Sequence, residues 1–236
     1  MSFYSILSRY YKHIFPINEK EITFLQSAIQ IKVKHAMDIG CGIGHTASTL
    51  ASMADAVIGI DANQDMVKQA QKEWPNISFI AADMRLLHTL DISDIDVMTC
   101  FGNTLVHINN QDVFKTLKQW SELLTNQGKL MIQIINYDRI MSQLITSLPT
   151  IDHPLVSMQR LYHHHDQTIQ FETSLTDKQN NQTFTQQVTL YPLLKQQLEQ
   201  ALVEAGFDEL EFFGGFDQQP WTPNSYATIV IAKKRL

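Results

Sequence analysis

The sequence predicts an α/β fold in which helices cover both faces of a mostly parallel sheet. Short apolar runs alternate along much of the chain with segments of helical periodicity, and this order is typical of right-handed βαβ units. The apolar runs contain few polar residues, as expected for strands that are buried on both faces.

The first 33 or so residues are predicted to be helical, because Ile22, Leu25 and Ile29 recur at helical spacing. Asn18 is the expected N-cap of this segment, with Glu21 completing a capping box three residues later. From residue 34 onward, strands and helices alternate. The expected strands are 35–39, 56–60, 77–82, 96–101 and 128–135, and the helices between them are 45–54, 63–74 and 109–128.

A different pattern occupies residues 137–190. The segments 160–177 and 182–191 are rich in β-branched and aromatic residues, and a polar turn separates them, which predicts an inserted antiparallel β-ribbon. A helix from Pro192 to Gly206 and two strands, 207–216 and 225–234, complete the chain. The predicted organisation is an N-terminal helical segment (1–33), a core (34–136 and 191–236) and an inserted ribbon (137–190) that covers the substrate.

Composition excludes several classes of protein. With 44% hydrophobic and 18% charged residues, the 236-residue chain is expected to form an ordinary core that needs neither disulfides nor metal. A net charge of −6 argues against a nucleic-acid partner, and no apolar run approaches the ~20 residues of a membrane span. The two cysteines, Cys41 and Cys100, lack metal-ligand spacing. We therefore expect a cytoplasmic protein without metal or membrane association, and a homodimer is compatible with the sequence.

The stretch "DIGCGIGHTA" places a glycine-rich turn between a strand and a helix, where nucleotides often bind. Two registers compete: Gly40-x-Gly42-x-Gly44 fits an adenosyl-sulfonium site, and Gly42-x-Gly44-x-x-Ala47 fits a dinucleotide site. Asp38 favours the first, because a carboxylate would repel a pyrophosphate by about 4 kcal/mol at about 4 Å but would attract a cation.

Two further carboxylates follow the next strands. Asp61, 21 residues after Gly40, is placed to accept hydrogen bonds from both hydroxyls of a ribose, although it could instead be a solvated loop residue. Asp83 is a candidate acceptor for the adenine amino group, with the Met84 amide near a ring nitrogen. Asp83 could equally be the N-cap of the segment 84–90.

Together, "MDIGCGIGHTA", "IGIDAN" and "AADM" resemble the class I S-adenosylmethionine-dependent methyltransferases over residues 34–136, and residues 192–234 fit the reversed last strand of that family. The resemblance implies a Rossmann-like, seven-stranded sheet in the order 3-2-1-4-5-7-6 and S-adenosylmethionine as the cofactor. The cofactor-binding residues that it implies are Asp38, Gly40, Cys41, Gly42, Gly44, Asp61, Ala62, Met66, Asp83, Met84, Phe101 and Gly102.

A narrower similarity to glycine N-methyltransferase and its relatives is carried by "CFGNTLVHI" and "INYDRI". The matching residues are Gly102, Asn103, His107, Asn136, Tyr137 and Asp138. Ile135 occupies the position of the arginine that holds the substrate carboxylate in that enzyme. This difference argues against glycine as the acceptor.

Three residues are candidates for catalysis. Asn103 is placed to orient the acceptor or the methionine part of the cofactor. His107 is placed to take a proton from the acceptor, although a capping or packing role for His107 is equally favoured. Tyr11 lies on the N-terminal segment, and similar tyrosines close over the cofactor in many small-molecule methyltransferases. Two histidines on one face of a strand, His163 and His165, are too few for a metal site.

The predicted function is methyl transfer to the nitrogen or oxygen of a small-molecule acceptor by in-line displacement (EC 2.1.1.-). Two alternatives remain open: a nicotinamide-dependent oxidoreductase that uses the second glycine register, and a non-catalytic scaffold that binds S-adenosylmethionine. The sequence does not identify the acceptor.

Overall fold

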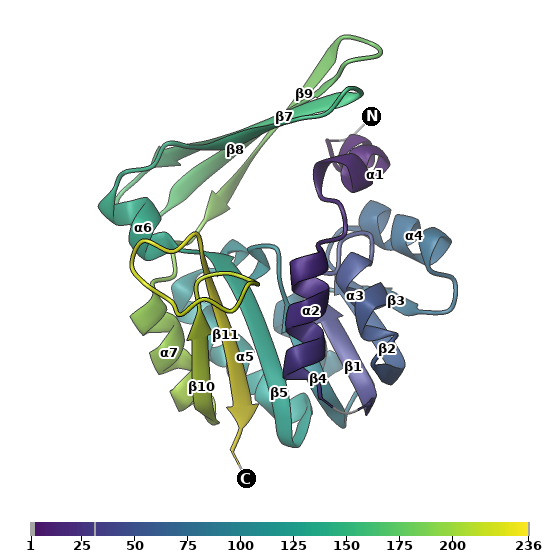
Figure 1. Cartoon of the computed structure of the whole chain (residues 1–236), viewed down its shortest axis with the longest axis vertical. Helices are drawn as coiled ribbons and strands as arrows, with labels where there is room; N and C mark the ends of the chain where they lie inside the picture. Colours follow the sequence, from purple (N-terminus) through teal and green to yellow (C-terminus); the bar gives the residue numbers. More distant parts are fainter. Residues whose placement is uncertain (1–2, 31, 236) are drawn as a thin grey trace.

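The computed structural model describes residues 3–30 and 32–235, so Met1, Ser2, Ile31 and Leu236 of the predicted segments lie outside the described residues. Its larger sheet has seven strands in the order β10-β11-β5-β4-β1-β2-β3 (Figure 1). When the strands of this sheet alone are numbered along the chain, β10 and β11 become strands 6 and 7. Read from β3, the order is then 3-2-1-4-5-7-6, as predicted, and β11 is antiparallel to both neighbours. The strands are β1 (Val33–Ile39), β2 (Ala54–Asp61), β3 (Ser78–Ala81), β4 (Ile95–Cys100), β5 (Leu124–Ile135), β10 (Phe207–Phe213) and β11 (Ala227–Lys234).

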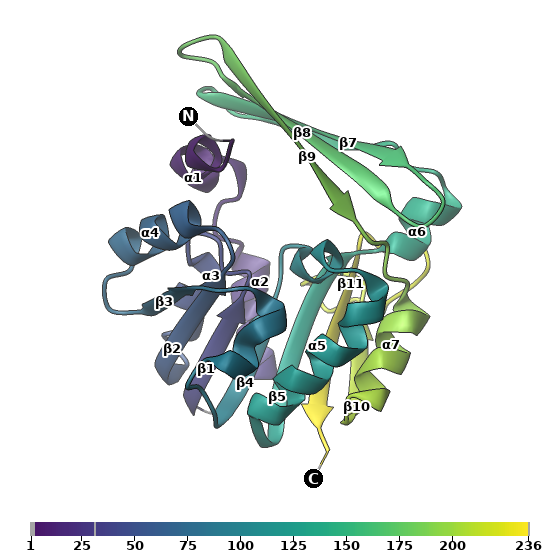
Figure 2. The same cartoon turned by 180° about the vertical axis from the view of Figure 1, so that it is seen from behind.

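Helices cover both faces of this sheet. On one face lie α2 (Glu19–Ala28), α3 (His45–Leu50) and α4 (Gln64–Glu73), and on the other α5 (Asn110–Leu123) and α7 (Lys195–Glu204) (Figures 1 and 2). Alternate residues of each strand face the two layers: Ala36 packs with the first group of helices, and Met37 packs with the second. This explains the continuous apolar runs of the strands.

A second sheet of four antiparallel strands stands apart from the first. It contains β6 (Ser147–Asp152), β7 (Val156–His164), β8 (Ile169–Asp177) and β9 (Gln182–Leu190), and α6 (Tyr137–Ser142) leads into it. The predicted antiparallel ribbon has fewer strands than this sheet, because segment 160–177 contains parts of two strands, β7 and β8. The amide of His165 donates to the carbonyl of Thr168 and closes a tight turn there.

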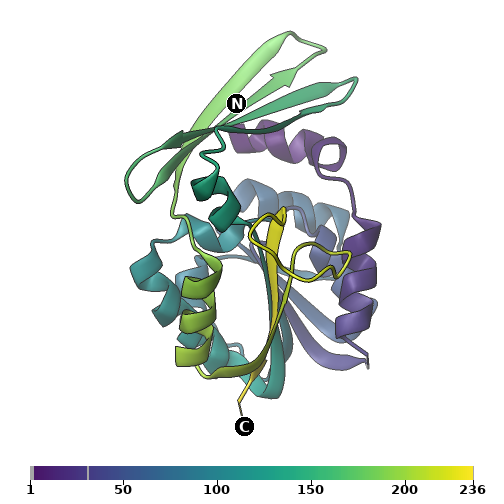
Figure 3. The ribbon, with the colours of Figure 1, turned by 60° about the vertical axis from the view of Figure 1, so that its left-hand side comes forward.

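Helix α1 (Phe3–Ile14) lies between the second sheet and α4 (Figure 3). Its residues Ile6 and Tyr10 belong to a buried apolar cluster with Val156 and Leu175 of the sheet. On the core side, the Lys12 ammonium lies 2.7 Å from the Glu73 carboxylate. The helix therefore connects the second sheet to the core at the carboxyl ends of the strands.

The two ends of the inserted segment meet at the core. The Asp138 carboxylate accepts a hydrogen bond at 2.9 Å from the backbone amide of Lys195, 57 residues later. The amide of Tyr191 donates to the carbonyl of Val106. The segment thus leaves and re-enters the core at one place.

Some predicted boundaries were wrong. Helix α7 begins at Lys195 rather than at Pro192, and Gly128 lies inside β5 rather than at the end of α5. Asn18 is the N-cap of α2, but Glu21 does not complete a capping box, since its carboxylate accepts a hydrogen bond from the Thr46 hydroxyl. In the described part of the chain, no helix has the length and apolar character needed to cross a bilayer.

Candidate functional site

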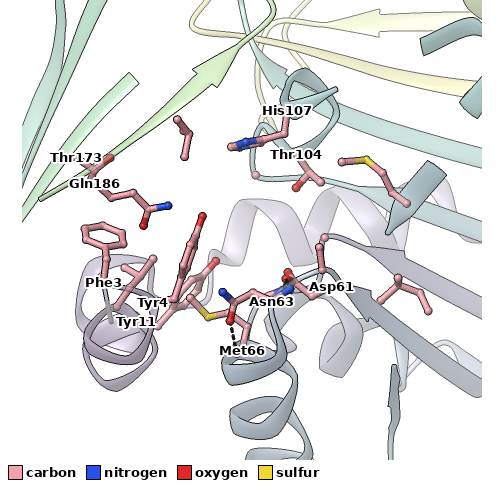
Figure 4. Close-up of a pocket in the computed structure, with 18 of the residues that line it drawn as sticks. Phe3, Tyr4, Tyr11, Asp61, Asn63, Met66, Thr104, His107, Thr173 and Gln186 are labelled. Carbon is pink, nitrogen blue, oxygen red and sulfur yellow. Dashed lines mark hydrogen bonds between the residues drawn. The ribbon is translucent and has the colours of Figure 1, made fainter. Parts of the chain in front are cut away.

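A cavity of about 580 Å³ lies where the carboxyl ends of β1, β2 and β4 face α1 and the second sheet (Figure 4). Its volume is typical of small-molecule sites. Ten of the predicted site residues line it: Tyr11, Gly40, Gly42, Asp61, Ala62, Met66, Asp83, Met84, Gly102 and His107. A second cavity of about 300 Å³ shares Tyr11, Gly40 and Gly102 with the first, and its wall adds Asp38, Cys41 and Phe101. Asn103 and Gly44 line neither cavity.

The glycine-rich loop is shaped by close packing. Gly40 has φ +72°, and a Cβ there would collide with the side chain of Thr104. Gly44, the N-cap of α3, has φ +88°, and a Cβ there would lie 2.7 Å from the ring of Phe79. Both positions require glycine. Gly40 forms part of the cavity wall, whereas Gly44 packs against Phe79 on the side of the loop away from the cavities.

Asp61 holds the loop in place. One carboxylate oxygen accepts from the amide of Gly42 at 2.9 Å, and the other accepts from the amide of Asn63 at 2.8 Å. Burial raises its pKa, and these two hydrogen bonds act in the opposite direction. Each oxygen of an ionised carboxylate has two lone pairs, so both can accept a further hydrogen bond from a ligand.

Asp38 is a buried carboxylate with an unused oxygen. It is 2% exposed, its Oδ1 accepts a hydrogen bond from the Thr99 hydroxyl at 2.8 Å, and no described group donates to its Oδ2 with hydrogen-bond geometry. Burial raises its pKa to about 7, although the Thr99 hydroxyl and the Ala47 amide oppose the rise. A buried charge without a partner is costly, and a bound cation would offset that cost.

We expect Asp38→Asn to stabilise the ligand-free protein at pH 8. The folded protein retains a proton on Asp38 that the unfolded chain loses near pH 4, so wild-type stability falls as the pH rises from about 4 to about 7. Asparagine removes this contribution. Urea unfolding at pH 5 and pH 8 measures the difference, and Asp91→Asn, an exposed position, serves as the control. If the free energy of unfolding depends on pH in the same way in Asp38→Asn and in the wild type, the pKa of Asp38 is not raised in the folded protein.

Asp83 fulfils the capping role that the sequence suggested. Its carboxylate accepts from the amide of Arg85 at 2.9 Å, as the N-cap of the short helix η1 (Met84–Thr89). The Arg85 guanidinium also donates to it, and this ion pair lowers the pKa of Asp83. Both residues line the cavity, and the proposed contact of Asp83 with adenine stays a prediction.

His107 ends the short helix η2 (Thr104–His107) and is exposed to the cavity. Within the described part of the chain, neither ring nitrogen has a hydrogen bond. The surrounding walls desolvate the ring and lower its pKa, so the imidazole is neutral at pH 7. A neutral ring with a free nitrogen can accept a proton from a ligand.

Asn103 and Tyr11 have different surroundings. The Asn103 amide donates to the Tyr137 hydroxyl at 3.0 Å, and its carbonyl accepts from the amide of Ile135 at 3.0 Å, so it positions the end of β5. Contact of Asn103 with an acceptor stays a prediction. Tyr11 points from α1 into the cavity with Tyr4 (Figure 4). Its hydroxyl lies 3.2 Å from the place of a Cβ on Gly42, and so covers the loop.

The second sheet supplies part of the wall that the sequence did not identify. Phe171 and Thr173 of β8 line the cavity, and the residues directly opposite them on β9, Val188 and Gln186, do so as well. Met158 of β7 and Phe3 of α1 complete this side. The signal was present as a two-residue period on both strands, which places alternate residues on one face.

The three consecutive histidines do not form a site together. His163 lies 3.5 Å from the Glu172 carboxylate, and His164 Nε2 lies 2.7 Å from the carbonyl oxygen of Ile145. Among the residues that the structure describes, no group of three or more His, Cys, Asp or Glu side chains is arranged to hold a metal ion.

Known proteins resemble this chain in sequence and fold. Residues 36–128 match the family model described as a methyltransferase domain. The ubiquinone biosynthesis O-methyltransferase of Coxiella burnetii is 29% identical over 124 residues, which cover 51% of each chain. This chain thus spans about half the length of the first curated relatives that it matches.

Two solved structures share the fold over nearly the whole chain. An S-adenosylmethionine-dependent methyltransferase from Clostridium acetobutylicum ATCC 824 superposes with a TM-score of 0.84 at 16% identity and covers 99% of both chains. The amino pentose methyltransferase CalS10 from Micromonospora echinaspora, solved with its methyl donor bound, has a TM-score of 0.72 at 17% identity and covers 97% of this chain and 96% of its own. At such identities the likeness shows the fold.

Proposed function

We propose that this chain, whose residues 36–128 match the methyltransferase-domain model and whose fold is that of S-adenosylmethionine-dependent methyltransferases, transfers a methyl group from S-adenosylmethionine to a small-molecule acceptor. The observation that carries the proposal is the buried Asp38 carboxylate beside the glycine-rich loop, whose Oδ2 accepts no hydrogen bond from the described residues. A positively charged ligand would be attracted to that carboxylate oxygen, whereas an anionic ligand would be repelled by it.

The residues of both cavities fit this methyl donor. Asp61 would hold the ribose hydroxyls through its remaining lone pairs, and Asp83 with the Met84 amide would hold adenine. Asp38 and the wall of the second cavity would accept the cationic end of the donor. When bound, S-adenosylmethionine supplies a methyl group on a positively charged sulfur.

Methyl transfer then depends on alignment and on the removal of one proton. A lone pair of the acceptor forms the new bond to the methyl carbon, and the pair of the breaking C–S bond stays on sulfur. The proton that the acceptor loses goes to the neutral His107 ring. Tyr11 covers the glycine-rich loop and, with the second sheet, keeps water away from the reacting atoms.

The dinucleotide alternative is disfavoured by the same charge. A pyrophosphate at Gly42–Ala47 would lie near Asp38 and Asp61, with no lysine or arginine on the wall of the second cavity within the described chain. Calorimetry with S-adenosylmethionine and with NADH separates the two proposals. Tight NADH binding without binding of S-adenosylmethionine would overturn ours. Donor binding without methyl release on any acceptor pool would instead identify a scaffold.

His107→Ala is expected to lower kcat by about 100-fold or more and to leave donor affinity unchanged, because a positioned base typically contributes 10²–10⁴-fold. In the wild type, kcat should fall as the pH drops through the lowered pKa of His107, below its usual value of about 6.5. Steady-state kinetics and donor titration measure both effects, with the exposed His88→Ala as the control. Equal losses in kcat and donor affinity would place His107 outside acid–base chemistry.

A further inference from the structure

We infer that the acceptor is a small primary amine without an acidic group, and that Gln186 holds its nitrogen. The inference rests on the proposed methyl transfer and extends it to the class of acceptor. Three arguments support it. They are the charges on the wall of the larger cavity, an unsatisfied oxygen on the roof of that cavity, which β8 and β9 of the second sheet form, and the number of protons that an acceptor can donate.

The charge on the cavity wall is negative. Of the described residues that line it, Asp61 and Asp83 are acidic, and the sole arginine or lysine is Arg85. The guanidinium of Arg85 is already paired with the carboxylate of Asp83 through Nε at 3.0 Å. An acceptor with a carboxylate or phosphate would find no free cation there, and burying its charge unpaired would be costly. A neutral amine avoids this cost.

Gln186 of the second sheet lines the larger cavity and carries a polar atom that is unsatisfied within the described residues. Its Oε1 is buried and has no hydrogen-bond partner among the described residues. The side chain extends from β9 into the cavity beside Thr173, the residue opposite it on β8 (Figure 4). Three apolar side chains of the same sheet also line the cavity, namely Met158, Phe171 and Val188. An unmade hydrogen bond at a buried oxygen is costly, so a ligand that donates an N–H or O–H group fits this position.

The number of protons distinguishes nitrogen from oxygen. A neutral primary amine attacks through its lone pair and becomes a methylated ammonium with two N–H groups. One proton passes to His107, and the other N–H stays bonded to Gln186 Oε1. A hydroxyl has a single proton, which His107 would take, so the oxygen of Gln186 would lose its partner during the reaction. An amine alone satisfies both residues throughout.

Matched acceptors test the class of substrate. The purified full chain is supplied with S-adenosylmethionine and a panel of compounds grouped by skeleton, such as phenethylamine, phenylalanine and 2-phenylethanol. Methyl transfer is measured for each. We expect kcat/KM of the amine to exceed that of the amino acid and the alcohol in the same group by at least about tenfold, the effect of burying an unpaired carboxylate in the first case and of losing one hydrogen bond in the second. A preference for the acids or alcohols, or no methylated amine in the panel, would overturn the inference.

Variants at Gln186 test the residue. Gln186→Leu should raise KM for the amine about tenfold and leave donor affinity unchanged, whereas Gln186→Glu, which keeps an acceptor oxygen, should retain the wild-type KM. Gln187→Leu, next in β9 but exposed and bonded to Glu172, should have no effect. An unchanged KM in Gln186→Leu, or equal damage in both Gln186 variants, would contradict the role. Donor binding with transfer to acids or alcohols would defeat this inference alone, and absence of donor binding would defeat the proposed function as well.

Discussion

Asp61→Ala is expected to weaken S-adenosylmethionine binding by at least tenfold, because hydrogen bonds to a charged acceptor contribute about 1.5–3 kcal/mol. Two effects add. The variant removes the proposed acceptor for the ribose hydroxyls, and it also removes the acceptor for the amides of Gly42 and Asn63. The loop that forms the wall of both cavities would lose its fixed position. Calorimetric titration of the donor measures the change in Kd.

The control for this variant lies on the same strand. Asp55→Asn changes a carboxylate near the start of β2, far from the loop, where it pairs with Lys32 in solvent. Its donor affinity should equal that of the wild type. If Asp61→Ala also binds the donor with wild-type affinity, Asp61 does not contact the ribose, and its role is limited to the loop.

The second large effect is expected in stability. Asn136→Ala should lower the free energy of unfolding by about 3 kcal/mol, since a typical hydrogen bond within a protein contributes about 0.5–1.5 kcal/mol and this side chain makes several. The fully buried Asn136 amide donates to the carbonyls of Thr222, Pro223 and Ser225 in the loop between β10 and β11. Its carbonyl caps α6 by accepting from the amide of Asp138.

Thermal unfolding gives a direct comparison. For a chain of this size the loss corresponds to a fall in Tm of about 6–12 °C. Asn224→Ala, an exposed residue of the same loop, should change Tm by less than about 2 °C, as is usual for surface substitutions. A fall in donor affinity without a change in Tm would mean that Asn136 acts on the ligand rather than on the fold.

The proximity of the residues that are proposed to bind the donor was predictable, because each has a fixed place relative to a strand. Each lies at the end of a strand or in the turn that follows it, and the carboxyl ends of parallel strands meet at one edge of the sheet. The sequence order of Gly40, Asp61 and Asp83 therefore translates directly into proximity. The strand order was available only through the family resemblance, since periodicity does not specify which strands are neighbours.

The roof of the cavity was not predictable in the same way. Thr173 and Gln186 face each other only because of the register between β8 and β9. That register depends on the turn between β8 and β9 at residues 178–181, whose polar composition predicts a turn but not its geometry. The turn at residues 165–168, which joins β7 to β8, is short and polar and was read as a continuation of a strand. A one-residue shift would have turned every side chain to the opposite face. The aromatic and β-branched composition predicts strands here, but it does not specify which face of them lines the cavity.

The end of α5 shows a limit of periodicity. Leu123 and Leu124 both continue the apolar stripe of the helix, yet the helix ends at the first and β5 begins at the second. A buried strand and a buried helix are equally apolar, so the pattern alone does not mark their junction. The domain limits, the homodimer, the cytoplasmic location and the lack of a nucleic-acid partner stay predictions.

The hydrogen bond between Asp138 and Lys195 has a consequence for how this protein can evolve. This hydrogen bond holds the two ends of the inserted segment together at the core, so the core has the same connection whatever residues lie between them. Loop-closure entropy rises only slowly with length, so the second sheet can gain, lose or exchange residues at little cost to the core. Under the proposed function, new acceptors can be acquired by changes in β7, β8 and β9 while the glycine-rich loop is inherited unchanged.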